Sequence, residues 1–382
     1  WWNTLESSFH KFPDDFELDL RTELTVDGTA AADYLLRTAG AGMLGGLALP
    51  LSLTPRQLKL DMKTIGFYRK KATAADPAKF FIKPDSSKVS MTSSSAGFFR
   101  FRPDDGKCEL LSFDSPFRTV NPALRESYPR QRRNMRAVAQ YWQHDSGPRP
   151  TICVIHGFMA DPYWLNRLFF ALPWFYAQGY DILLYTLPHH GRRQSRLSPF
   201  SGHGLFAGGL SHLNESMAHA VHDFRIFMDY LESRGVSKIG VTGISLGGYT
   251  SALLAAVEDR LHFSIPNVPV ASLPDLVLEW YPLNLAIKSL LKLSNTSVRE
   301  ARHMLAVHSP LTYRPLIPQE RLMVIAGAGD RLAPPKHARL LWDHWDRPRI
   351  HWFPGNHLLH LDKGKYLKEI ARFLKEIGFD RD

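Results

Sequence analysis

Residues 239–250 read Ile-Gly-Val-Thr-Gly-Ile-Ser-Leu-Gly-Gly-Tyr-Thr. An apolar run ends at Ser245, and a run of small, helix-favouring residues begins directly after it. The spacing Gly243-x-Ser245-x-Gly247 is typical of a strained strand-to-helix turn that exposes a serine hydroxyl, where a Cβ at either glycine would crowd its neighbours. The start of the following helix favours developing negative charge. The stretch predicts a nucleophilic Ser245, with an ordinary glycine-rich turn as the alternative.

Two later motifs place an acid and a base at strand ends. Val324–Gly327 is an apolar strand followed by Asp330, and Phe353 precedes the turn Pro-Gly-Asn that leads to His357. An aspartate can orient a histidine and stabilise its cation, and the histidine can take and return a proton. His360 is a rival base three residues further on, and Asp275 is a rival acid.

The motif His156-Gly157-Phe158-Met159 follows the apolar strand 151–155. A glycine there lets the chain turn sharply with backbone N–H groups directed inward, as one half of an oxyanion hole requires. We assign that half to the N–H of Phe158, with Met159 as runner-up. The other half is the N–H of Leu246, directly after the serine.

Alternating strand and helix patterns surround these motifs from about residue 106. The strand candidates are 109–113, 136–142, 151–155, 181–186, 238–244, 262–265, 321–326 and 349–353. Two antiparallel strands followed by this alternation predict an α/β fold with a mostly parallel sheet covered by helices on both faces. Residues 269–316 are apolar, helix-forming and punctuated by prolines, so they read as a helical cap insertion in a domain spanning 105–382.

Residues 1–104 form a largely helical extension of unknown role in this interpretation, with helical spacing at 31–38 and 55–71. The Ser-rich stretch 84–96 reads as a loop. Residues 40–45 match G-x-G-x-x-G but follow a helical pattern, so we reject them as a dinucleotide site. Residues 38–55 carry no charge, yet they are too short for a membrane span and favour an interfacial or buried helix.

The composition indicates an ordinary globular protein with a basic surface. The chain has 382 residues, a formal net charge of +10 and two cysteines, which form no disulfide framework. The basic clusters, Arg125, Arg130, Arg132, Arg133 and Arg136, and then Arg192, Arg193 and Arg196, read as solvated faces. No nucleic-acid signature is present.

We expect a cytoplasmic protein. Peripheral membrane contact through residues 38–55 and the basic patches is an open alternative. The chain begins with Trp1, not Met.

The order Ser245, Asp330, His357 is that of the α/β-hydrolase triad. With the oxyanion motif, residues 106–378 resemble the serine hydrolases of the α/β-hydrolase superfamily, in particular its esterases and lipases. The resemblance implies an eight-stranded sheet and hydrolysis of a small-molecule or lipid ester through an acyl-serine, without metal or cofactor. It also implies a substrate-lining loop at 187–193; the lining candidates are His156, Met159, His189 and His190. Peptidase or thioesterase activity, or a non-catalytic binding role, are the alternatives, and no feature specifies an oligomeric state.

Overall fold

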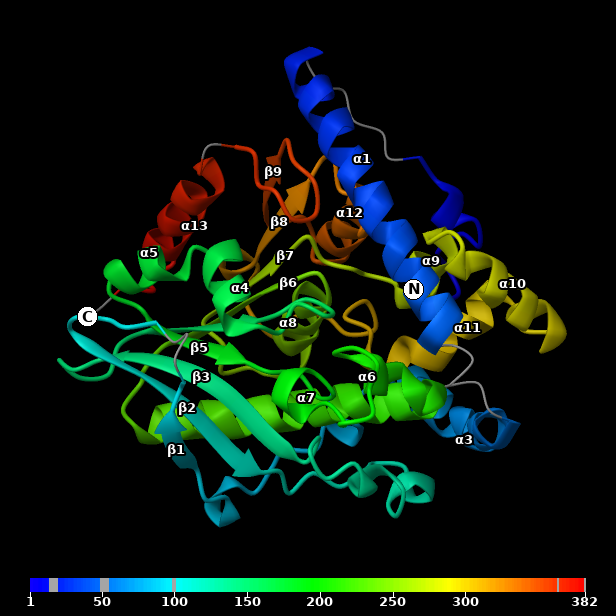
Figure 1. Ribbon diagram of the computed structural model, residues 1–382, viewed down its shortest axis with the longest axis horizontal. Coiled ribbons are helices and arrows are strands. Elements are labelled where there is room, and N and C mark those ends of the chain that lie inside the picture. The colour runs from blue at the N-terminus through cyan, green and yellow to red at the C-terminus, as the bar shows by residue number, and fades with distance from the viewer. Residues whose placement is uncertain (14–19, 49–54, 98–100, 363, 381–382) are drawn as a thin grey trace.

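The computed structural model describes residues 1–13, 20–48, 55–97, 101–362 and 364–380 (Figure 1). Its centre is one nine-stranded sheet in the order β1-β2-β3-β5-β4-β6-β7-β8-β9. The strands are β1 (Thr92–Ser95), β2 (Gly106–Asp114), β3 (Arg136–His144), β4 (Thr151–Ile155), β5 (Asp181–Tyr185), β6 (Ile239–Ile244), β7 (Phe263–Asn267), β8 (Met323–Gly327) and β9 (Arg349–Phe353). Strands β1 to β3 pair antiparallel, and the six from β5 to β9 in this order are parallel. The predicted α/β fold with a mostly parallel sheet is confirmed.

The strand β1 corrects two expectations, the eight-stranded sheet and the Ser-rich loop at 84–96. Residues 92–95 pair with β2, and the Thr92 hydroxyl donates to the carbonyl of Ser112 at 2.8 Å. All four residues of β1 are exposed. An edge strand with no buried face has no apolar alternation, so the sequence pattern could not distinguish it from a loop.

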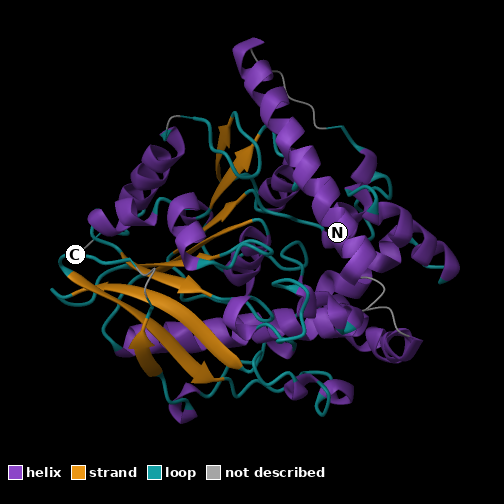
Figure 2. Ribbon diagram, in the orientation of Figure 1, coloured by secondary structure: helices purple, strands orange, loops and turns teal. Residues whose placement is uncertain are grey.

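Helices cover both faces of the sheet (Figure 2). On one face lie α7 (Gly209–Ser233), α8 (Leu246–Val257) and α12 (Pro335–His344), and on the other lie α4 (Tyr163–Phe169), α5 (Leu172–Ala177) and α13 (Lys365–Glu376). Each face has its own hydrophobic core. Every residue of β4, β5 and β8 is buried, which explains why these strands read as continuous apolar runs.

The N-terminal extension packs onto the α/β domain through α1 (Leu20–Met43), the π-helix η2 (Leu44–Ala48) and α3 (Pro55–Ala74). Helix α3 docks on α7, where the Tyr68 hydroxyl donates to Glu215 at 2.9 Å. The rejected G-x-G-x-x-G at 40–45 lies within the helical backbone of α1 and η2. Of the stretch 38–55, residues 49–54 lie outside the described residues. No helix in the described ranges is long and apolar enough to cross a membrane.

The insertion between β7 and β8 contains α9 (Leu273–Glu279), α10 (Leu283–Leu293) and α11 (Val298–Leu305). A buried ion pair joins two of its helices, with Arg302 Nη2 2.7 Å from Asp275 Oδ1. The same guanidinium donates to the carbonyl oxygens of Leu5 and Glu6, both at 2.7 Å. Residues 5 and 6, near the N-terminus, are therefore hydrogen-bonded to the insertion.

Candidate active site

Ser245 lies between β6 and α8 with φ 58° and ψ −112°, a conformation that non-glycine residues rarely adopt. A Cβ on Gly243 would lie 2.4 Å from the carbonyl carbon and oxygen of Gly247. A Cβ on Gly247 would lie 2.0 Å from the carbonyl oxygen of Ile155, at the end of β4. Both flanking positions therefore require glycine, as the sequence spacing predicts, and the strained turn leaves Ser245 partly exposed.

Asp330 and His357 follow the adjacent parallel strands β8 and β9 and meet at the same sheet edge. His357 Nδ1 and Asp330 Oδ2 are 2.7 Å apart. The other carboxylate oxygen, Oδ1, accepts the backbone N–H groups of Leu332 at 2.9 Å and Ala333 at 2.8 Å. These bonds fix the position of the Asp330 carboxylate. Because the carboxylate in turn holds the imidazole of His357 through Nδ1, the Nε2 atom remains available for proton transfer.

The pKa of His357 is raised above its ordinary value. Burial of the imidazole opposes its charging, but the Asp330 carboxylate outweighs burial through its charge and its hydrogen bond, and Asp33 adds to the effect. Among the described residues, no hydrogen bond joins the Ser245 hydroxyl to His357. Hydrogen bonds between a catalytic serine and its histidine are often long before substrate binds. The positions of Ser245 and His357 therefore allow such a pair, although the bond between them is not formed in this structure.

The turn after β4 lies beside the serine. A Cβ built on Gly157 would be 3.6 Å from Ser245 Cβ. The N–H of Ala160 closes this turn on the carbonyl of Gly157 at 3.1 Å, and Met159 takes φ 59°. In the described part of the chain, the N–H groups of Phe158 and Leu246 donate to no acceptor. Two such donors flanking a serine are what an oxyanion hole needs.

The two rivals from the sequence have other partners. His360 Nε2 lies 3.2 Å from Asn267 Oδ1, and its ring stacks on Tyr366. Burial lowers the pKa of His360 to about 4. Asp275 is occupied by its two bonds to Arg302, so its carboxylate holds the insertion together.

The predicted lining residues differ in exposure. Met159 is 37% exposed, whereas His156, His189 and His190 are buried. His156 Nε2 accepts the N–H of Leu187 at 3.1 Å, so Nδ1 carries the proton and donates to the carbonyl of Gly157 at 2.8 Å. His156 thus ties the loop after β5 to the oxyanion turn.

Further along the same loop, the side chains turn into the protein. His189 Nε2 lies 3.0 Å from the Ser216 hydroxyl on α7, and the His190 ring packs against Phe158. Arg193, expected on a solvated face, is fully buried and pairs with Asp223 on α7 at 2.7 Å. That expectation was wrong for Arg193, because an ion pair to a buried aspartate leaves no pattern in the local sequence. A substrate-lining role for the three histidines stays a prediction.

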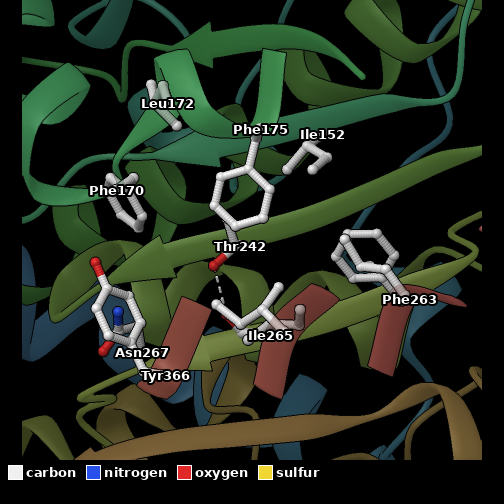
Figure 3. Close-up of a pocket in the computed structure, with 11 residues that line it drawn as sticks. Ile152, Phe170, Leu172, Phe175, Thr242, Phe263, Ile265, Asn267 and Tyr366 are labelled. Atoms are coloured by element: carbon white, nitrogen blue, oxygen red, sulfur yellow. Dashed lines mark hydrogen bonds between the residues drawn. The ribbon is translucent and has the colours of Figure 1, made fainter. Parts of the chain in front are cut away.

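A small cavity lies between the sheet and helices α5 and α13 (Figure 3). Its volume is about 20 Å³, and its walls include Phe175, Thr242, Ile265 and Ile370. This space suits about one water molecule and is too small for a substrate. At one end is Asn267, whose carbonyl accepts the N–H of Ser245 at 3.0 Å.

Sequence reasoning missed one residue at the site, Asp33 on α1. Its side chain is fully buried, and Oδ2 accepts the N–H of His357 at 2.9 Å and that of Arg331 at 3.0 Å. A lone aspartate in the small-residue run Ala30-Ala31-Ala32 hints at a buried role, but nothing local links it to residues some 300 positions away. In the described ranges, no group of three or more His, Cys, Asp or Glu side chains could hold a metal ion.

Comparison with known sequences finds relatives of no stated function. The chain is 32% identical over 229 residues to the uncharacterized proteins Rv2627c and MT2702 of two Mycobacterium tuberculosis strains, covering 59% of this chain and 53% of each relative. The chain thus spans about half the length of the curated relatives it matches. No family model matches the chain.

Comparison with solved structures finds esterases. The acetyl xylan esterase 1 of Thermoanaerobacterium sp. JW/SL YS485 superposes with a TM-score of 0.56 at 17% identity, covering 82% of this chain and 93% of that enzyme. The acetyl xylan esterase of Paenibacillus sp. R4 gives 0.55 at 16% identity, with 82% and 94% covered. At such identities the likeness concerns the fold. Together with the sheet order and the serine turn, it shows that this chain has the α/β-hydrolase fold.

Proposed function

We propose that the protein is a serine hydrolase that cleaves carboxylic esters through an acyl-serine intermediate. The observation that carries the proposal is the convergence of three elements at one sheet edge. These are the strained Ser245 turn, the Asp330–His357 contact of 2.7 Å, and the free N–H groups of Phe158 and Leu246. No metal or cofactor is part of the proposed reaction.

The mechanism follows from the roles that these groups can play. His357 Nε2 takes the proton of the Ser245 hydroxyl as its oxygen attacks the ester carbonyl, and Asp330 stabilises the resulting imidazolium. The N–H groups of Phe158 and Leu246 bind the carbonyl oxygen as it becomes negative. His357 then protonates the leaving alcohol, and water, deprotonated by His357, releases the acid from the serine. Met159 as an oxyanion donor is the runner-up to Phe158.

The acyl group is proposed to be short. Two esterases that share the fold at a TM-score above 0.5 are named for acetyl esters. A p-nitrophenyl ester series from acetate to palmitate tests this preference. Hydrolysis that falls steeply beyond butyrate supports it, and a maximum at long chains contradicts it.

A lipid-directed esterase is the second candidate, because large apolar side chains are exposed around the insertion and α1. Leu293 is 87% exposed, Leu35 is 75% exposed and Leu285 is 54% exposed. Sedimentation with liposomes that contain anionic lipid tests this candidate. Binding that Leu35→Ser and Leu293→Ser both weaken would favour it, and the absence of sedimentation would exclude it.

A further inference from the structure

Asp33 connects the two loops that carry the proposed acid and base. Its Oδ2 atom accepts a hydrogen bond from the backbone N–H of Arg331, the neighbour of Asp330, and another from the N–H of His357. The carboxylate is fully buried and belongs to the N-terminal extension. One oxygen atom therefore bridges the loop after β8 and the loop after β9.

Helix α1 brings Asp33 to this position through one buried face. Val26, Ala30, Asp33 and Ala41 are buried at helical spacing, whereas Tyr34 and Leu35 on the outer side are exposed. One turn after Asp33, Arg37 Nη1 donates to the carbonyl of Arg331 at 3.0 Å. The helix thus holds both the N–H and the C=O of the residue that follows the proposed catalytic acid.

The same helix continues across the sheet edge beyond the acid and base loops (Figure 1). Gly40 approaches Trp280 of the insertion, and η2 contacts α6 (His203–Ala207), whose Phe206 packs on Phe158 in the oxyanion turn. The helix therefore spans from the acid and base loops to a helix that contacts the oxyanion turn. At the acid and base loops, the helix is held by the hydrogen bonds that Asp33 accepts.

Charge at this position acts on the imidazole. The titratable and charged groups around His357 are Asp330 on the loop after β8, Asp33 on α1 and His360 on its own loop. Burial, followed by the charge of Asp330, raises the pKa of Asp33 to about 6. Asp33 is therefore largely ionised at pH 7 and above, where its negative charge favours the imidazolium form of His357.

We propose that Asp33 is a positioning residue of the triad: it fixes the backbone of the acid and base loops and places a second negative charge beside the imidazole of His357. The N-terminal extension is then part of the catalytic apparatus and not an accessory segment. This inference rests on the proposed function, since positioning has meaning only if Asp330 and His357 act on Ser245.

Three full-length variants test the inference. Asp33→Asn keeps an oxygen acceptor for both N–H groups but removes the charge, and Asp33→Ala removes both. Asp61→Asn is a matched control, since Asp61 on α3 also accepts two backbone N–H groups, those of Leu210 at 2.8 Å and Ser211 at 2.9 Å, but at the start of α7. The readouts are the melting temperature, kcat/KM for p-nitrophenyl acetate against pH, and the His357 pKa from NMR titration of its imidazole.

We expect Asp33→Asn to lower the His357 pKa and to move the acid limb of kcat/KM to lower pH. Asp33→Ala should shift the limb in the same way and also lower kcat by about 100-fold, since loosened loops misplace the imidazole. Asp61→Asn should lower the melting temperature without moving the acid limb or the His357 pKa.

An unshifted acid limb and an unshifted His357 pKa in Asp33→Asn, with an active wild type, would overturn the inference and leave the proposed function standing. An equal shift in Asp61→Asn would also overturn it, because the effect would then be a general response to destabilisation. A wild-type protein without any ester hydrolysis would instead contradict the proposed function. The NMR titration would still decide whether the negative charge of Asp33 raises the pKa of the His357 imidazole. Should Asp33→Ala fail to fold, the isosteric Asp33→Asn variant carries the test.

Discussion

The substitution Gly247→Ala tests the link between the serine turn and the oxyanion turn. A Cβ at this position would lie 2.0 Å from the carbonyl oxygen of Ile155 and 2.8 Å from that of His156, whereas ordinary contact begins at 3.4 Å. Both obstacles are backbone atoms at the end of β4, so no side chain can rotate away. The start of α8 and the end of β4 must separate by about 1.4 Å at the closer contact.

That displacement moves the N–H of Leu246 relative to the N–H of Phe158, the proposed oxyanion pair. A misplacement of about 1 Å can reduce kcat by about 100-fold, and losing one oxyanion donor costs about 100- to 1,000-fold. We therefore expect Gly247→Ala to lower kcat on p-nitrophenyl acetate by at least about 100-fold. Overpacking should also destabilise the fold by about 1–3 kcal/mol, measured by urea unfolding.

The matched control is Gly66→Ala on α3, where an added Cβ meets no atom within 4 Å. It should leave kcat unchanged and stabilise the protein by up to about 1 kcal/mol, because alanine loses less backbone entropy on folding. A folded Gly247→Ala variant with wild-type kcat would show that the oxyanion pair does not depend on the close approach of the two turns.

Further predictions concern the acid and the base. Asp330→Asn should lower kcat by about 10⁴-fold, since an amide does not hold the required imidazole tautomer; a residual rate near wild type would remove Asp330 from the triad. Asp275→Asn weakens a buried ion pair with Arg302, so we expect destabilisation of up to about 5 kcal/mol in thermal or urea unfolding, with serine labelling retained in the folded fraction. His360→Gln should leave kcat/KM and its acid limb unchanged in a pH series, and loss of the limb would make His360 the base.

Much of the α/β fold could be predicted because its local signals are strong. Buried parallel strands such as β4 and β8 read as uninterrupted apolar runs, and their boundaries in the structure fall within two residues of those expected. At Gly243 the steric cause is the backbone of Gly247, which lies within five residues, so the local sequence carries it; at Gly247 the cause is the carbonyl oxygen of Ile155 on β4, a contact that only the fold creates. The exposed edge strand β1 has no such signal and was missed.

Contacts between distant segments could not be predicted. Asp33 on α1 meets His357, and Asp223 on α7 meets Arg193, only because the fold brings these distant segments together. A buried aspartate or arginine looks the same in sequence as a solvated one until its partner is known. For the same reason Asp275 remained a rival acid until its ion pair with Arg302 was seen.

The proposed function depends above all on Ser245 acting as a nucleophile that His357 activates. Labelling by a fluorophosphonate probe, with the modified peptide identified by mass spectrometry, tests it most directly. We expect wild-type protein to be labelled on Ser245, Ser245→Ala not to be labelled, and His357→Ala to be labelled far more slowly. Labelling that persists in Ser245→Ala, or a folded wild-type protein that is never labelled, would contradict it.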